Sequence, residues 1–99
     1  MRITPQEISA IRRVTAEVAG AVARVSLFGS RTRDDLRGGD IDLLVELPEA
    51  TADKLSVALR TSARLQMLIG QRKIDVLVTD PQTVETPLIL AARLEGNAL

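Results

Sequence analysis

Residues 27–45 read LFGSRTRDDLRGGDIDLLV, and the boundaries inside this stretch predict how the chain folds. Its apolar start belongs to a segment, Val25 to Phe28, that ends at a glycine. Its end belongs to a β-branched and apolar segment from about Asp40 to Leu47, which Pro48 closes. Both segments predict strands, because Val, Ile, Leu and Phe between glycine and proline breakers are typical of strands.

The first helix is marked by the sequence Thr4-Pro5-Gln6-Glu7. Thr is a preferred N-cap, Pro fits the first helical position, and Glu three residues after the cap completes a capping box. Apolar residues then recur at helical spacing, and Gly20 is the expected stop.

A long helix is expected between Thr51, as its cap, and Gly70. Residues on one of its faces recur at helical spacing, so this face is expected to lie in the core, or partly in the core and partly on a partner surface. These residues are Leu55, Ala58, Leu59, Ser62, Leu65 and Ile69.

Two more elements follow this helix. Residues 73–79 are rich in Ile, Val and Leu and predict a third strand, which ends in a turn at Asp80-Pro81. Thr86-Pro87 repeats the cap and proline of the first helix and predicts a last short helix over 88–94, stopped at Gly96.

The order of elements is α-β-(α)-β-α-β-α, with an optional helix in the polar stretch 31–39. This order predicts an α/β (or α+β) fold in which helices cover a short mixed sheet. The 99 residues are 45% hydrophobic, which suits one hydrophobic core. We therefore expect a single small domain over residues 1–99.

The composition excludes several kinds of chemistry. The chain has no His, Cys, Trp or Tyr, and Phe28, an expected core residue, is its only aromatic side chain. Disulfides, cysteine zinc sites, Ser-His-Asp triads and stacks of aromatic side chains on nucleobases are therefore impossible. Any reaction must use carboxylates, hydroxyls, backbone amides and Arg.

The net charge is zero, which argues against general nucleic-acid binding, but the charge is uneven along the chain. Residues 1–33 carry six Arg and two Glu, whereas residues 34–99 carry seven basic and eleven acidic side chains. This split suits a site where acidic metal ligands meet an anionic ligand. No apolar run approaches the roughly 20 residues of a membrane helix, and no signal peptide is evident, so we expect a cytoplasmic protein without a membrane partner.

Three aspartates are candidate metal ligands. Asp40 and Asp42 alternate with apolar residues, so they project from the same face of the predicted strand. Mg²⁺ prefers hard oxygen ligands such as this pair. Asp75 interrupts an apolar strand and would lie beside the pair if the two strands are neighbours. The alternative is structural: Asp40 ends a strand, and Asp42 and Asp75 lie on solvated faces.

The turn Gly29-Ser30 is a candidate phosphate site. Glycine lets the backbone approach a ligand closely, and the amides that follow it can point at phosphate oxygens. Ser30 adds a hydroxyl, and Arg31 or Arg33 adds a charged fork. The alternative is an ordinary turn that ends a strand, with solvated arginines.

The segments Phe28-Gly29-Ser30-Arg31 and Gly39 to Val45 together resemble the signature of the DNA polymerase beta-type nucleotidyltransferase superfamily. Within it, the chain is most similar to the minimal, MNT-type and antitoxin-like nucleotidyltransferases of prokaryotes. The resemblance covers nearly the whole chain and implies the polymerase beta-like nucleotidyltransferase fold. Two departures from the signature fall in a loop, where length varies freely. Nine residues separate Ser30 from Asp40, one fewer than in many relatives, and Gly38-Gly39 replaces the more common loop sequence.

The resemblance implies a role for each matching residue. Asp40 and Asp42 would bind two Mg²⁺ ions, and Asp75 would bind the catalytic ion and help to deprotonate the attacking hydroxyl. Gly29 and Ser30, with Arg31, would bind the β- and γ-phosphates of ATP or another nucleoside triphosphate. The implied activity is transfer of AMP from ATP to a hydroxyl.

The resemblance also implies a partner. Such proteins often pair with a helical-bundle protein, either a HEPN-type toxin whose tyrosine they adenylylate or a substrate-binding protein. Because this chain has no Tyr, a modified tyrosine must belong to the partner. The main alternative is a non-catalytic binding module that neutralises a partner by stoichiometric contact. An antibiotic-modifying or nucleic-acid-tailing transferase would need an added acceptor domain.

Overall fold

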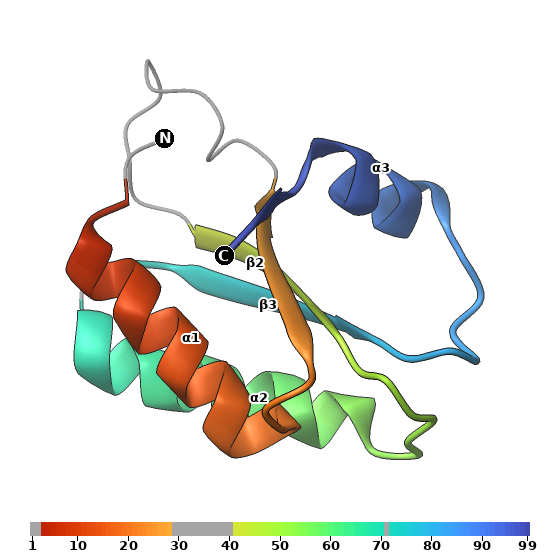
Figure 1. Ribbon diagram of the computed structural model, residues 1–99, viewed down its shortest axis with the longest axis horizontal. Coiled ribbons are helices and arrows are strands. Elements are labelled where there is room, and N and C mark those ends of the chain that lie inside the picture. The colour runs from red at the N-terminus through yellow and green to blue at the C-terminus, as the bar shows by residue number, and fades with distance from the viewer. Residues whose placement is uncertain (1–2, 29–40, 71) are drawn as a thin grey trace.

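The computed structural model describes residues 3–28, 41–70 and 72–99. These residues form three helices and a four-stranded mixed sheet with the strand order β3-β2-β1-β4 (Figure 1). The elements are α1 (Pro5–Ala19), β1 (Arg24–Phe28), β2 (Ile41–Glu46), α2 (Lys54–Ile69), β3 (Ile74–Thr79), α3 (Pro87–Glu95) and β4 (Asn97–Ala98). β1 is antiparallel to β2 and β4, whereas β2 is parallel to β3. The predicted α/β class with a short mixed sheet is confirmed.

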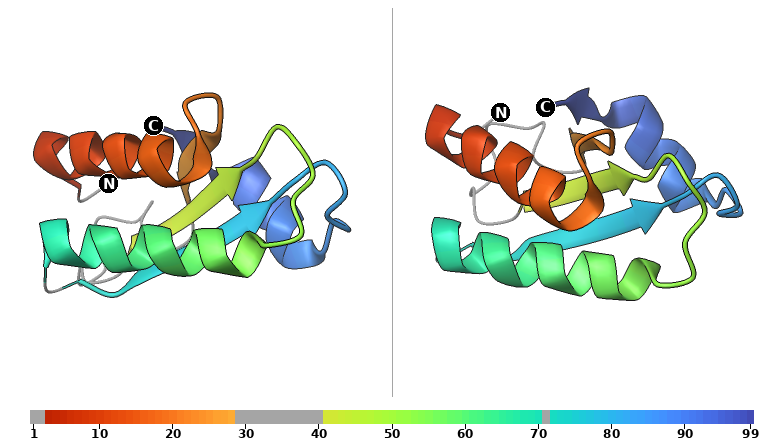
Figure 2. Two further views of the ribbon diagram at one scale, coloured as in Figure 1. Left: turned by 90° about the horizontal axis from the view of Figure 1, so that it is seen from below. Right: turned by 60° about the horizontal axis from the view of Figure 1, so that its bottom comes forward.

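The sheet separates two layers of helices. α1 and α2 lie side by side against one face, as both views of Figure 2 show. Residues that alternate along the strands point into this layer and form the main core with Ile11, Val14 and Leu65: Val25, Leu27, Ile41, Leu43, Val45, Ile74 and Val78. Leu44, from the opposite face of β2, is also fully buried, and Ile89 and Ala92 of α3 are buried. α3 therefore covers part of the second face, on which Asp42 also lies.

The predicted helix starts and stops are confirmed for α1 and α3. The Glu7 amide donates to Thr4 Oγ1 at 3.1 Å, and the Thr4 amide donates to Glu7 Oε1 at 2.9 Å, which completes the capping box. The Ile89 amide donates to Thr86 Oγ1 at 3.2 Å. Gly20 follows α1 with a φ of 101°, in the left-handed region that favours glycine.

Thr4→Ala is expected to lower the free energy of unfolding by about 1 kcal/mol, because the Glu7 amide loses its acceptor, Thr4 Oγ1, while the bond from the backbone amide of residue 4 to Glu7 Oε1 remains. Urea unfolding followed by circular dichroism measures this change. Thr86→Ala, which removes the equivalent cap bond of α3, is the matched comparison and is expected to have an effect of similar size. An unchanged midpoint for Thr4→Ala would show that the capping box adds nothing to stability.

The start and the buried face of the long helix differ from the prediction. α2 begins at Lys54 with Asp53 at its N-cap, not directly after Thr51. Leu65 is buried as predicted, but the side chains of Leu55 and Leu59 are 71% and 60% exposed. Thr61 is fully buried instead, because the helix also packs against α1 and turns its inner face toward that neighbour.

The short strand β4 was not predicted from the sequence. Its two residues pair with Ser26 and Leu27 of β1, and two residues are too few for any periodic pattern. Gly96 makes the close return to β1 possible, since a Cβ at this position would lie 2.7 Å from the Ala92 carbonyl oxygen.

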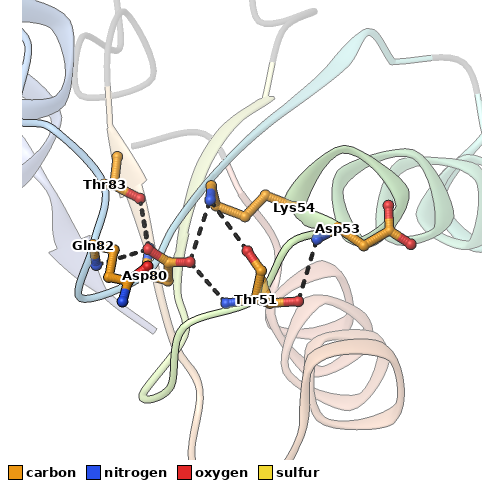
Figure 3. A network of polar contacts seen from close by, with 6 residues as sticks. All are labelled: Thr51, Asp53, Lys54, Asp80, Gln82 and Thr83. Carbon is orange, nitrogen blue, oxygen red and sulfur yellow. Dashed lines mark hydrogen bonds and ion pairs between the residues drawn. The ribbon is translucent and has the colours of Figure 1, made fainter.

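Thr51 belongs to a polar network that joins the loop before α2 to the loop after β3 (Figure 3). At its centre the Asp80 carboxylate is buried and accepts hydrogen bonds from the amides of Thr51 and Gln82, both at 2.9 Å. It also accepts from Lys54 Nζ at 3.2 Å and Thr83 Oγ1 at 3.1 Å. The network holds Thr51 in the loop before α2, whose N-cap is Asp53.

Acidification is expected to weaken this network and the fold. The hydrogen bond from the Thr51 amide, helped by those from Gln82, Lys54 and Thr83, outweighs desolvation and holds the Asp80 pKa well below its ordinary value of 3.8. A lowered folded-state pKa means that the stabilisation is complete above pH 3.8 and is lost as the pH falls below it. Urea unfolding at several pH values should therefore show that the free energy of unfolding of Asp80→Asn is well below that of wild type at neutral pH. This difference in free energy of unfolding should become smaller in acid, and a difference that is independent of pH would contradict this account.

Candidate functional site

Asp42 and Asp75 are direct neighbours in the sheet. The register of the parallel strands β2 and β3 pairs Ile41 with Ile74 and Asp42 with Asp75. The Ile41 amide donates to the Lys73 carbonyl at 2.8 Å and fixes this register where the strands begin. Neighbouring strands lie about 4.8 Å apart, and paired residues point to the same face, so the two carboxylates share one surface. The prediction that Asp75 would fall beside the pair is confirmed for Asp42.

The two aspartates differ in exposure. Asp42 is half-buried in a strand with neighbours on both sides, whereas β3 lies at an edge of the described sheet. The Asp75 side chain is 56% exposed, and its carboxylate lies 3.9 Å from Lys73 Nζ. Asp75 thus has the exposed edge position of the structural alternative, and its charge carries no burial penalty. The carboxylate of Asp42 lies in register beside it, and like charges on neighbouring strands repel unless cations compensate them.

Phe28 extends this row of residues on the other side of Asp42. It is the last residue of β1 and pairs with Asp42 across the antiparallel ladder. Its side chain is half-buried on the face that carries the carboxylates, so the expectation of a core residue is wrong. Gly29 follows Phe28 directly in the sequence, and Asp40 precedes Ile41 directly.

The other predicted site residues, Gly29, Ser30, Arg31 and Asp40, lie outside the described residues, as does the optional helix over 31–39. Of the six predicted residues, the structure therefore places Asp42 and Asp75, and it brings them together. Lys73, beside Asp75, is a residue that sequence reasoning missed. Its only sequence signal is a basic side chain two positions before a strand carboxylate.

The donor set fits a divalent cation with hard-oxygen preference. Mg²⁺ is typically bound by one or two carboxylates, with water and substrate phosphates as its other ligands. Asp42 and Asp75 provide two carboxylates on adjacent strands, and Asp75 is open to solvent. Within residues 3–28, 41–70 and 72–99 no group of three or more acidic, His or Cys side chains is placed to hold a metal. Two carboxylates, one of them open to solvent, suit a metal whose other ligands are water and the phosphates of a substrate.

Residues 8–95 match the family described as Nucleotidyltransferase domain. The chain belongs to this family. Comparison with curated proteins gives no match. The family transfers a nucleoside monophosphate from a nucleoside triphosphate and typically uses a divalent metal, and the small α/β domain agrees with the polymerase beta-like fold.

A helix that crosses a bilayer must be both long and apolar. None of the described helices meets both requirements.

Proposed function

We propose that this nucleotidyltransferase uses Mg²⁺ and ATP to transfer AMP to a hydroxyl of a partner protein. The observation that carries the proposal is the register of Asp42 with Asp75, which sets two carboxylates side by side on one open face. Membership of the family supplies the reaction class. The partner protein and the base are part of the proposal.

The reaction forms a bond between the acceptor oxygen and the α-phosphorus of ATP and breaks the bond to the β-phosphate, so that pyrophosphate leaves. Bound Mg²⁺ would neutralise phosphate charge and lower the pKa of the hydroxyl. Asp42, together with Asp40, would hold the metal on the sheet. Asp75 would help to hold it and would take up the proton of the hydroxyl. Gly29, Ser30 and Arg31 would bind the β- and γ-phosphates.

The position of Asp75 supports an acceptor that comes from another chain. Its strand lies at an edge of the described sheet, and its carboxylate is more than half exposed. α3 covers part of the same face and presents three exposed leucines, Leu88, Leu90 and Leu94. Leu90 and Leu94, four residues apart, share one side of this helix, and exposed apolar residues on one side of a helix favour contact with a protein. A helical-bundle partner, either a HEPN-type toxin or a substrate-binding protein, fits such a surface, and the chain would then be the antitoxin or catalytic half of a pair.

Incubation with Mg²⁺, ATP and the protein encoded beside this chain tests the proposal. Intact-mass spectrometry is expected to show that the partner gains one AMP, and pyrophosphate release should match this gain in amount. Both signals should disappear with EDTA. A folded, complexed partner that stays unmodified, with no pyrophosphate released, would contradict the proposal.

The second candidate function is stoichiometric neutralisation of the partner, which the exposed leucines of α2 and α3 favour. The double substitution Asp40→Asn and Asp42→Asn separates the two functions. Catalysis predicts that the double variant binds the partner but fails to neutralise it. Neutralisation that survives the loss of nucleotide transfer would identify binding as the function.

A further inference from the structure

A cavity of about 690 Å³ lies away from the candidate active site. It is formed by the second half of α1, the turn that follows and the edge of the sheet where β1 begins and β4 ends. Its lining residues are Arg12, Arg13, Thr15, Ala16, Gly20, Ala21, Ala23, Arg24, Val25, Ala98 and Leu99. Arg24 and Val25 are the first two residues of β1, whereas Asp42 is paired with Phe28 at the other end of that strand. The cavity and the carboxylates are therefore at opposite ends of β1.

The charged side chains that line this cavity are all positive, and the α-carboxylate of Leu99 is the acidic group among its lining residues. Arg12, Arg13 and Arg24 line it, and no Asp or Glu side chain does. Among the described residues, none of these three arginines forms an ion pair. Unpaired guanidinium groups around a concave surface attract anions and bind phosphate or carboxylate oxygens in a fork.

The acidic residues of the neighbourhood are engaged elsewhere. Glu7 of α1 pairs with Arg72 at 3.0 Å, and Glu17 pairs with Arg64 of α2 at 3.3 Å. Both pairs lie toward α2, whereas Arg12 lines the opposite flank of α1. Glu46, the cross-strand neighbour of Arg24, pairs with Arg93 of α3 at 3.3 Å. Arg12, Arg13 and Arg24 are thus left without an ion pair to these carboxylate side chains.

Thr15 provides a second, independent observation. It lines the cavity, is only 2% exposed, and its Oγ1 has no hydrogen-bond partner. A buried hydroxyl without a partner is destabilising, and threonine in a helix readily rotates between two side-chain conformations. Because Thr15 Oγ1 is sealed from solvent in the observed conformation, the side chain must rotate before an anion seated among the arginines can accept its hydrogen bond.

We propose that this cavity binds a small ligand with a phosphate group, held by Arg12, Arg13 and Arg24 and by the Thr15 hydroxyl. The volume is within the range of roughly 300–1,000 Å³ that is typical of small-molecule sites. Its alanines and Val25 provide an apolar wall for the rest of the ligand. The zero net charge of the chain favours a small ligand over a nucleic acid. This site does not depend on the proposed function.

Titration of ¹⁵N-labelled protein with inorganic pyrophosphate, without divalent metal and in physiological salt, tests the proposal by NMR. Saturable shifts are expected at the amides of Ala16, Gly20 and Ala23. The double substitution Arg12→Gln and Arg13→Gln should weaken binding by about a hundredfold and Thr15→Val by about tenfold, since each removes hydrogen bonds to a charged group. Arg60→Gln is the matched control, because Arg60 is exposed on α2 and does not line the cavity.

Thr15→Val keeps the shape of the side chain, so its effect reports on the hydroxyl, and a thermal melt confirms the fold of each variant. Shifts that do not saturate, that are centred on Phe28 and Asp42, or that weaken equally in Arg60→Gln would overturn the proposal. Unchanged affinity in Thr15→Val would overturn it as stated. Preferential binding of an acidic peptide or of single-stranded RNA at the same amides would do so as well.

Discussion

Asp42→Asn is expected to lower the rate of nucleotidyl transfer by about 10³-fold while the protein stays folded. The substitution keeps the size of the side chain and removes the charge that we assign to binding the metal and, through it, the triphosphate. Loss of a single preorganised electrostatic contact in an active site typically reduces the rate by about 10²–10³-fold. Loss of a metal ligand also weakens nucleotide binding, so both kcat and the affinity for Mg²⁺-ATP should fall. Pyrophosphate release and nucleotide titration measure the two effects.

Asp53→Asn is the matched control for this prediction. Asp53 is an exposed aspartate at the N-cap of α2 whose side chain makes no cap hydrogen bond, so its charge is removed without loss of a structural contact. The control should retain wild-type activity. Circular dichroism and a thermal melt of Asp42→Asn exclude unfolding as the cause. An Asp42→Asn protein that is as active as Asp53→Asn would remove Asp42 from the site.

The elements that the sequence predicted well are those with local signals. The capping box of Thr4 and Glu7, the cap Thr86 and the stops at Gly20 and Gly70 each act within a few residues, so the pattern and its cause lie together. The strands were recognised to within about two residues at their ends, because apolar runs between breakers are also local.

The features that the sequence could not predict depend on distant parts of the chain. The Thr51 amide donates to Asp80, 29 residues away in the sequence, and Asp53 rather than Thr51 is the N-cap of α2. Leu55 and Leu59 share a helical stripe with Leu65, yet only Leu65 is buried, because the position of α1 decides which flank of α2 is covered. β4 forms only because the chain returns to β1 after α3.

The candidate site depends both on a local sequence signal and on a contact between distant parts of the chain. Its motif was visible because Asp42 alternates with apolar residues on a strand, but its pairing with Asp75 required a register between strands separated by the whole of α2. A shift of that register by one residue would place Asp75 on the opposite face from Asp42. The observed pairing therefore adds independent support to the assignment of these carboxylates.

Asp75→Asn is expected to separate chemistry from binding. Because Asp75 lies on the exposed edge strand and is assigned to the acceptor hydroxyl, its loss should reduce kcat by about 10²–10⁴-fold, the usual effect of removing a general base. The affinity for Mg²⁺-ATP should change little, in contrast to Asp42→Asn, because Asp42 and Asp40 remain to hold the metal. A loss confined to kcat indicates an interaction made only in the transition state.

Nucleotide titration and single-turnover transfer on the same preparation measure this contrast, and Lys73→Gln controls for the electrostatic effect of the Lys73–Asp75 pair. That pair is long and exposed, so Lys73→Gln should change stability little. If Asp75→Asn weakened nucleotide binding as much as Asp42→Asn did, Asp75 would be a second anchor for the donor rather than the group that faces the acceptor. Unchanged transfer in Asp75→Asn would instead make Asp75 the solvated edge residue of the structural alternative and would leave the reaction to the carboxylates of β2 and the segment before it.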